Sequence, residues 1–290
     1  MTILQAIVLG IVEGITEFLP VSSTGHLILA AWMLGLGGTP ETKEAVDAFN
    51  IIIQGGAILA VLGLYRGRVA QMLRGIQGRD GRGRMLLILL IIAFLPAALL
   101  GPLLDSFLEA RLFRPLPVIA MLAGGGLLLI VLKPWQDQLR RRERQGDHHV
   151  FKSLDELTVQ DALIIGLLQC VAMVPGTSRS MMTILGGLGV GLSPSKAAEF
   201  SFLLGLPTLG AACLYKLLKQ FRAHGTGFID TLGGWSPTLI GIAAATISAA
   251  IAVRWLVRYL ERHSFAAFGV WRIAVATVIG VLLWQGVMTL

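Results

Sequence analysis

Charged residues and cysteines are scarce in this sequence. Charged side chains make up 14% of the 290 residues, whereas a soluble protein carries about a quarter. With 55% hydrophobic residues and a mean hydropathy of +0.75, the composition excludes a soluble globular protein and predicts an all-α polytopic membrane protein. The two cysteines, Cys170 and Cys213, lie in apolar runs, which favours buried packing residues over a disulfide or a metal site.

Acidic residues are fewer than basic ones, and the net charge is +7. The basic residues nevertheless concentrate in short segments between apolar runs, where they set membrane orientation, so we expect no nucleic-acid partner. Segment 66–84 contains six arginines, and segment 134–158 contains four arginines and Lys152. Because positively charged segments face the cytoplasm, we expect both segments inside and both chain termini outside.

Apolar segments of spanning length occur at six places. They are 48–65, 85–104, 116–133, 197–215, 236–257 and 266–285. Two further apolar regions, 3–36 and 160–192, are each interrupted near the middle by Pro, Ser, Thr and Gly residues. Each half of such a region holds roughly 14–17 residues, which is short for a full span. We therefore predict that each region forms a re-entrant helical hairpin, which enters the membrane and returns on the same side.

An internal repeat relates the two interrupted regions. Gly10-Ile-Val-Glu13 aligns with Gly166-Leu-Leu-Gln169, and Pro20 aligns with Pro175, at offsets of 156 and 155 residues. A nearly constant offset over such a distance indicates two homologous halves. Gln169 replaces the glutamate in the second half, so only the first hairpin has a pair of acids.

The repeat predicts the organisation of one membrane domain, 1–290. Each half, at about 1–133 and about 158–290, contains one re-entrant hairpin and three spans, and a cytoplasmic linker at about 134–157 joins them. Because three is odd, the second half is upside down relative to the first, which makes an inverted-topology repeat. We expect the two hairpin tips to meet near the membrane midplane, where such proteins place their sites.

Glu13 and Glu17 lie inside the first apolar region, four residues apart, and therefore on one face of a helix. An ionisable group at membrane depth costs at least about 2.5–3.5 kcal/mol and usually marks a functional site. The alternative is a helix end in the membrane interface, where headgroup water solvates the acids. The mid-segment position favours function, either as a metal site or as a metal ligand and a general base.

Ser22, Ser23, Thr24 and His26 follow the break at Pro20. Helix capping accounts for one or two of these hydroxyls. It does not account for His26, because a neutral histidine beside two acids can act as a base, a nucleophile or a metal ligand. The alternative is a hydrogen-bonded packing histidine, and the nearby acids favour catalysis.

Arg179 stands where the second interrupted region begins its second helix. Helix N-termini with small residues offer free amides to an anion, and an arginine adds a bidentate fork for phosphate. Ser178, Ser180 and Thr183 add hydroxyl donors. The alternative is a structural ion pair with Glu13 or Glu17, and the two roles can coexist before substrate binds. Together these groups suit metal-assisted chemistry on a phosphate whose apolar tail lies in the membrane.

Two segments carry a resemblance to a known family. Glu13-Gly-Ile-Thr-Glu17-Phe-Leu-Pro-Val-Ser-Ser-Thr-Gly-His26 and Pro175-Gly-Thr-Ser-Arg-Ser-Met-Met-Thr183 closely resemble the two motifs of the bacterial undecaprenyl-pyrophosphate phosphatases, the family associated with bacitracin resistance. The similarity runs nearly end to end and includes the segment Ala197-Ala-Glu-Phe-Ser-Phe-Leu-Leu204. The resemblance implies a plasma-membrane enzyme that hydrolyses undecaprenyl pyrophosphate to undecaprenyl phosphate and phosphate, recycling the lipid carrier of cell-wall synthesis.

The resemblance also implies a divalent cation, Mg²⁺ or Ca²⁺, and a site open to the outer (periplasmic) face. The expected catalytic residues are Glu13, Glu17, Ser23 and His26, with the two glutamates as metal ligands. The expected phosphate-binding residues are Ser22, Thr24, Ser178, Arg179, Ser180 and Thr183.

Three questions stay open at the level of sequence. The nucleophile is His26, Ser23 or a water that His26 activates. A secondary transporter or a lipid flippase is the alternative function, because inverted repeats with broken hairpins and acids are also typical of transporters. The expected partners are a polyprenyl pyrophosphate lipid and the membrane, and a homo-oligomer is one assembly that the sequence allows.

Overall fold

The computed structural model describes residues 1–36, 40–112, 114–145, 150–225, 229 and 232–288. Within these residues the secondary structure is helical, with one isolated β-bridge between Lys152 and Leu192. Six helices are long and apolar enough to cross a membrane, and they correspond one to one to the six predicted segments. They are α3 (Pro40–Leu64), α5 (Gly81–Leu112), α6 (Pro115–Val131), α10 (Pro194–His224), α12 (Trp235–Arg262) and α13 (Ala266–Trp284). The prediction of an all-helical multi-pass protein is confirmed.

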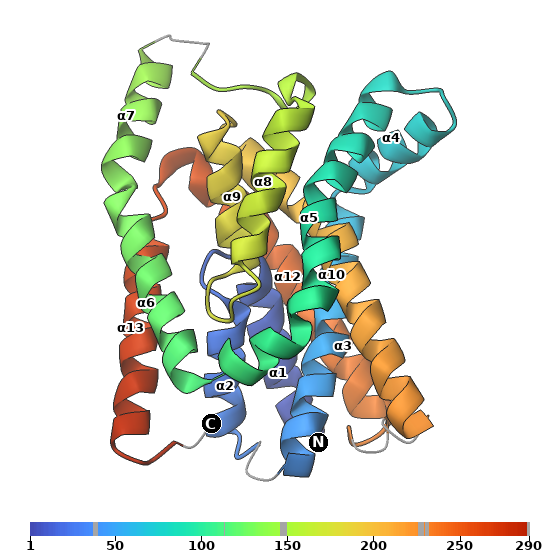
Figure 1. Cartoon of the computed structure of the whole chain (residues 1–290), viewed down its shortest axis with the longest axis vertical. Coiled ribbons are helices and arrows are strands. Elements are labelled where there is room, and N and C mark those ends of the chain that lie inside the picture. The colour runs from blue at the N-terminus through green and yellow to red at the C-terminus, as the bar shows by residue number, and fades with distance from the viewer. Residues whose placement is uncertain (37–39, 113, 146–149, 226–228, 230–231, 289–290) are drawn as a thin grey trace.

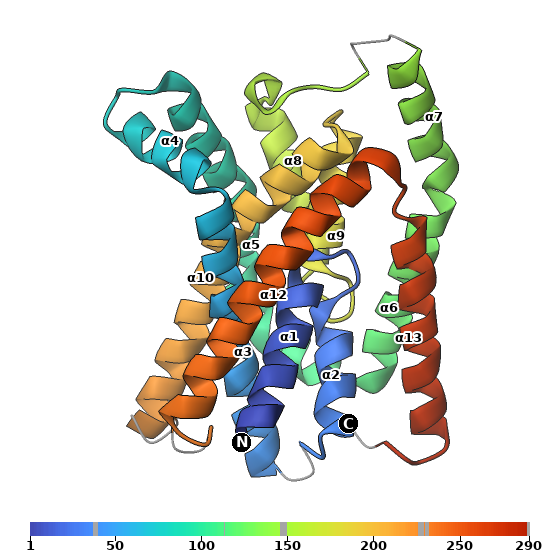
Figure 2. The ribbon, with the colours of Figure 1, turned by 180° about the vertical axis from the view of Figure 1, so that it is seen from behind.

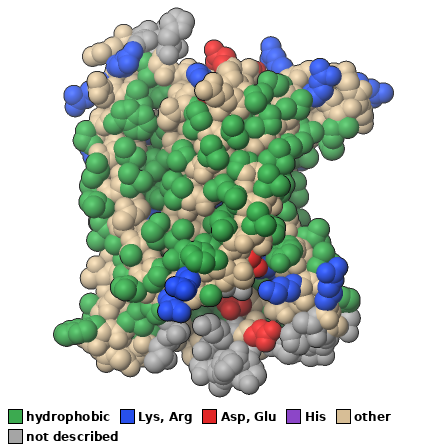
Figure 3. All heavy atoms as spheres, viewed as in Figure 1, with side chains coloured by type: hydrophobic (Ala, Val, Ile, Leu, Met, Phe, Trp, Pro, Cys, Tyr) green, Lys and Arg blue, Asp and Glu red, His purple; other side chains and the backbone are tan. Residues whose placement is uncertain are grey.

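The sides of the helix bundle are apolar. Hydrophobic side chains cover the middle of the face in Figure 3, and Lys and Arg side chains gather toward its two ends. Large side chains such as Leu103, Ile251 and Trp284 point outward from the long helices. An apolar surface of this extent is unsuited to water and suits the hydrocarbon core of a bilayer.

Four short helices form two hairpins inside the bundle. The first hairpin is α1 (Ile3–Phe18) and α2 (Ser23–Met33), and the second is α8 (Val159–Val171) and α9 (Arg179–Gly189). Figures 1 and 2 show that they enter from opposite ends of the bundle and that their connecting loops lie at mid-height. The loops touch, because Ser180 Oγ donates a hydrogen bond of 2.9 Å to the Leu19 carbonyl.

The two hairpins repeat the same local geometry 156 residues apart. Thr2 and Thr158 each open the first helix of a hairpin with a capping box, which satisfies otherwise unpaired helix amides. Ser22 and Ser178 precede the second helices with φ angles of 71° and 78°. Among the described residues these are the only positive φ angles outside glycine. Such a conformation costs on the order of 1–2 kcal/mol for a residue with a Cβ. It persists only where the surrounding structure stabilises it, which is the case in both loops.

Close packing against α12 sets the orientation of α1. A Cβ at Gly14 would meet the Ser248 side chain and the α12 backbone at Ala245. Only a residue without a side chain permits this approach, as in many membrane helix pairs. Helix α1 is thereby held with Glu13 and Glu17 buried inside the protein.

The arginine-rich segments contain helices of their own between the spanning helices. Segment 66–84 contains α4 (Arg66–Ile76), which projects from the bundle in Figure 1. The linker begins with α7 (Lys133–Arg144), and a short 3-10 helix (Leu154–Glu156) precedes α8. Residues 146–149 of the predicted linker lie outside the described residues.

Candidate active site

Glu17 and Arg179 meet at the tips of the two hairpins. Arg179 Nη2 lies 2.9 Å from Glu17 Oε1, and the two side chains are 11% and 5% exposed. Arg179 Nη1 also donates to the Ser201 carbonyl at 3.0 Å, and the guanidinium lies 5.6 Å from the centre of the Phe18 ring. The structure therefore brings together the acid and the arginine that the sequence places 162 residues apart.

Ser23 completes this contact from the start of α2. Its hydroxyl donates to Glu17 Oε2 at 2.9 Å, so both carboxylate oxygens of Glu17 have a partner. A hydroxyl that donates to a buried carboxylate is oriented for loss of its proton. Among the hydroxyls of the first loop, Ser23 is the one for which the structure shows a base in contact.

Glu13 lies one helical turn from Glu17 and is only 1% exposed. Neither of its carboxylate oxygens has a hydrogen-bond partner. A buried acid without a partner is unfavourable unless a cation or a proton accompanies it. Among the described side chains, the Glu13 carboxylate is therefore the one that most favours a bound cation or a proton.

Glu13 and Glu17 can supply some, but not all, of the ligands of a hard divalent cation. Among the described residues no group of three or more His, Cys, Asp or Glu side chains is placed to hold a metal. Mg²⁺ and Ca²⁺ bind oxygen ligands, and Mg²⁺ usually takes one or two carboxylates and fills its other positions with water and substrate phosphate. Glu13 and Glu17 match this pattern.

The hydroxyls of α9 are bonded mainly within the protein. Ser178 caps the helix by accepting from the Met181 amide at 3.3 Å. Ser180 donates to the Leu19 carbonyl, and Thr183 lies 2.9 Å from the Arg179 carbonyl and 2.5 Å from the Ser201 hydroxyl. These bonds hold α9 against the first loop and α10, and contact of the same hydroxyls with phosphate stays a prediction.

The first loop differs from the expectation of simple capping. Ser22 precedes α2 but makes no side-chain capping bond, although Ser178 caps α9 from a closely similar backbone conformation. Its carbonyl lies 2.8 Å from His26 Nδ1, and Trp271 Nε1 donates to His26 Nε2 at 2.8 Å. The His26 ring thus contacts Ser22 and Trp271, while Ser23 makes the contact with Glu17. Thr24 is half-buried in the first turn of α2.

Arg272 is a functional candidate that sequence reasoning missed. Its side chain is fully buried in α13, and it donates to four main-chain carbonyls. These are the carbonyls of Pro20, Met121, Leu122 and Gly176, at 2.8–3.3 Å. One guanidinium therefore ties the first loop, the second loop and α6 together. An arginine within an apolar span is itself a signal of function.

The second loop and α9 contain further unpartnered polar atoms. Thr177 Oγ1 and Arg179 Nε are buried without a hydrogen-bond partner, as is Gln169 Nε2 on α8. Buried polar groups are nearly always hydrogen-bonded. These atoms and the Glu13 carboxylate are therefore candidate contacts for a bound ion or ligand.

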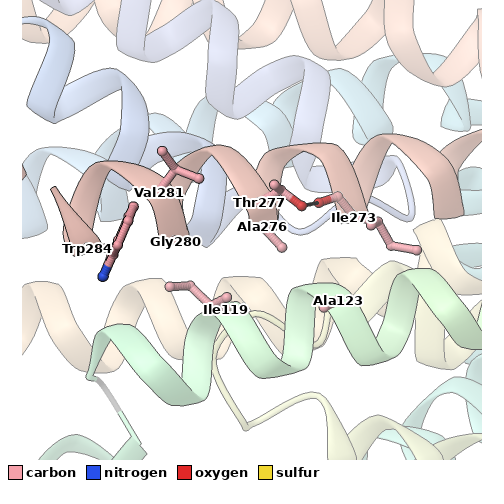
Figure 4. A pocket seen from close by; sticks show the side chains of 8 residues that line it. All are labelled: Ile119, Ala123, Ile273, Ala276, Thr277, Gly280, Val281 and Trp284. Atoms are coloured by element: carbon pink, nitrogen blue, oxygen red, sulfur yellow. Dashed lines mark hydrogen bonds between the residues drawn. The ribbon is translucent and has the colours of Figure 1, made fainter.

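An apolar groove of about 380 Å³ lies between α6 and α13 and is shown in Figure 4. Its lining residues are Ile119, Ala123, Ile273, Ala276, Thr277, Gly280, Val281 and Trp284. The groove contains no ionisable group, so it suits a hydrocarbon chain and not the chemistry of the hairpin tips.

Residues 6–278 match the family described as Bacitracin resistance protein BacA. A protein of Chromobacterium violaceum named undecaprenyl-diphosphatase 1 is 42% identical over 285 residues, covering 98% of this chain and 97% of the relative. Undecaprenyl-diphosphatase 2 of Rhodospirillum rubrum is 44% identical over 287 residues, covering 99% and 97%. The undecaprenyl-diphosphatase of Sorangium cellulosum is 44% identical over 275 residues, covering 95% and 84%.

Proposed function

The chain belongs to the Bacitracin resistance protein BacA family, and from this membership we propose that it is an integral membrane phosphatase of the bacterial plasma membrane. It hydrolyses undecaprenyl pyrophosphate to undecaprenyl phosphate and inorganic phosphate, which recycles the lipid carrier of cell-wall synthesis. The observation that carries the chemistry is the buried contact between Glu17 and Arg179 at the meeting point of the two hairpins.

Arg179 binds the diphosphate in this proposal. Nε and Nη2 lie on the same edge of a guanidinium and form one of its two-pronged donor sites. In Arg179 the Nε of this edge has no partner, while Nη2 is bonded to Glu17. A phosphate that displaces Glu17 from Nη2 can accept hydrogen bonds from both Nε and Nη2. The hydrogen bond from Nη1 to the Ser201 carbonyl still holds the guanidinium in place.

The displacement of Glu17 links substrate binding to the cation. Once a phosphate binds Arg179, one Glu17 oxygen is free to face the same space as the unpartnered Glu13 carboxylate. A divalent cation bound by the two acids would supply charge neutralisation on the transferred phosphoryl group. We propose Mg²⁺ or Ca²⁺ because both favour oxygen ligands.

Ser23 is the nucleophile that the geometry favours. Its hydroxyl already donates to Glu17, so Glu17 can accept the proton as the Ser23 oxygen forms a bond to the terminal phosphorus. The bridging P–O bond breaks, and undecaprenyl phosphate leaves. Water then cleaves the phosphoserine and restores Ser23, with His26 as the base for that water.

The membrane arrangement is a finer proposal. We propose an inverted-topology repeat with two re-entrant hairpins, both termini outside and the site open to the periplasmic face. The repeated loop geometry at Ser22 and Ser178 and the opposite directions of the two hairpins support it. The arginine-rich segments 66–84 and 134–158 favour the cytoplasmic side for the end at which the second hairpin enters.

Phosphate release from a polyprenyl pyrophosphate tests the function. Detergent-purified protein is assayed with Mg²⁺ or Ca²⁺ and with a chelator. We expect cation-dependent release that Arg179→Ala and Glu17→Ala each reduce by at least about a hundredfold, because each loses a transition-state contact worth about 2.7 kcal/mol or more. Arg82→Ala is the matched control, since that arginine is exposed on the surface. Lipid flux across liposomes without phosphate release would instead support a transporter or flippase.

The nucleophile is tested separately. Rapid quenching during turnover of labelled substrate should trap phosphate on Ser23. Label on the His26 ring would reverse the assignment, and label on neither residue would favour direct attack by water.

A further inference from the structure

We infer that Trp271 blocks the reactive nitrogen Nε2 of His26 in the substrate-free protein until substrate displaces the indole, while the Ser22 carbonyl keeps His26 in one tautomer. The inference rests on the proposed function, because it concerns when His26 becomes available to the reaction. It is carried by the contacts of the His26 ring and by the unequal burial of Trp271 and Arg272.

The hydrogen bonds of His26 define its tautomer. A carbonyl oxygen only accepts, so Nδ1, at 2.8 Å from the Ser22 carbonyl, has to carry the proton. An indole N–H only donates, so Nε2, at 2.8 Å from Trp271 Nε1, has to be the unprotonated nitrogen. Both partners therefore specify the same neutral ring.

Trp271 also blocks Nε2. The two rings are nearly coplanar, with an interplanar angle of 15° and centroids 6.1 Å apart, so the edge of the indole faces the edge of the imidazole that carries Nε2. Since the indole N–H occupies the lone pair of Nε2, His26 can neither accept a proton nor attack phosphorus in this arrangement. The hydrogen bond from Nδ1 to the Ser22 carbonyl, in contrast, orients the His26 ring so that Nε2 can act as a base.

The burial of neighbouring residues favours movement of the indole and not of the helix. Arg272 is fully buried and bonded to four carbonyls, which fixes α13 at this position. Trp271 is 55% exposed, so no protein group packs against much of its ring. A change of side-chain rotamer at Trp271 would release Nε2 while the Ser22 carbonyl keeps the tautomer unchanged.

The reactivity of His26 in the substrate-free protein tests the inference. Diethyl pyrocarbonate modifies the unprotonated nitrogen of a neutral imidazole, and peptide mass analysis measures its rate at His26 alone. Trp271→Phe keeps an aromatic ring but removes the donor, so we expect modification to be faster on the order of fivefold, the effect of one lost hydrogen bond. Trp284→Phe is the matched control, because Trp284 lies on the same helix and is 86% exposed.

Equal modification rates in wild type and Trp271→Phe would overturn the inference, as would an equal acceleration in Trp284→Phe. A second measurement is independent of labelling. If Trp271 only covers His26, Trp271→Phe should lower KM with kcat unchanged, whereas a purely structural role predicts a fall in kcat and in thermal stability. Failure of the wild type to release phosphate would refute the proposed function but would leave the labelling result standing.

Discussion

Gly205 offers a way to move the Arg179 guanidinium without changing any charged residue. It lies on α10, opposite the guanidinium, and a Cβ placed there would be 3.0 Å from Nη1 and Nη2 and 3.2 Å from Cζ of Arg179. Contacts this short are rare, so in Gly205→Ala the guanidinium has to retreat by a few tenths of an ångström. Any retreat disturbs the bonds from the guanidinium to Glu17 and to the Ser201 carbonyl, which are 2.9 and 3.0 Å long.

We expect Gly205→Ala to lower the activity of the protein without lowering the stability of its fold. A weakened charge-assisted hydrogen bond loses part of its roughly 1.5–3 kcal/mol, so we expect kcat/KM to fall about tenfold, which corresponds to about 1.4 kcal/mol. Alanine is also a better helix former than glycine by about 1 kcal/mol, which opposes any loss of stability from crowding. Gly205→Ala should therefore unfold at the wild-type temperature or slightly above it.

The matched control is Gly210→Ala, on the same helix, where an added Cβ meets nothing within 4 Å. Phosphate release and thermal unfolding in detergent are measured for wild type and both variants. Wild-type kinetics in Gly205→Ala would refute the view that the position of Arg179 is critical. Equal losses in the two alanine variants would show that α10 flexibility, and not the guanidinium, is responsible.

Three further predictions follow from the site and its supports. Glu13→Gln should abolish the rise in unfolding temperature that Mg²⁺ or Ca²⁺ gives the wild type, because an amide is a poor ligand for a hard cation; an unchanged rise would exclude Glu13 as a ligand. Arg272→Met should lower the free energy of unfolding by about 3–5 kcal/mol, since it leaves buried carbonyls without donors, and Arg272→Lys should recover part of this. A loss below about 1 kcal/mol in Arg272→Met would contradict the role of that side chain as a tie between the loops. Gly14→Ala should cost about 1–3 kcal/mol by overpacking against α12, whereas Gly124→Ala, where a Cβ meets nothing within 4 Å, should be neutral or stabilising by up to about 1 kcal/mol.

The proximity of Glu17 and Arg179 was predictable because it follows from segment lengths and charge distribution, and not from the details of side-chain packing. The segment lengths, the positions of the breaks and the arginine-rich segments together predict two hairpins that enter from opposite sides, with their tips close together. The contact of Ser23 with Glu17 was also within reach, since the two residues are six positions apart across a tight loop.

Other parts of the site depend on tertiary contacts that no local pattern reveals. Arg272 follows the same rule of charged residues within apolar spans that identifies Glu13, but its partners are main-chain carbonyls, which have no sequence signal. Trp271 looks like an ordinary aromatic residue of a membrane helix. For Ser180 and Thr183 the sequence supplies hydroxyls but not their direction, and the structure bonds them to the protein.

Charge balance explains why a diphosphate substrate would need a cation in this site. Two acids, Glu13 and Glu17, and two arginines, Arg179 and Arg272, are buried around the loops, and with all four ionised their charges cancel. A diphosphate entering the same space adds negative charge that the protein alone leaves uncompensated, and uncompensated buried charge is costly. Because the Glu13 carboxylate has no hydrogen-bond partner in the protein, a divalent cation would bind beside it without substrate, and more tightly once a diphosphate adds its negative charge. The arrangement thus favours binding of cation and substrate together over binding of either alone.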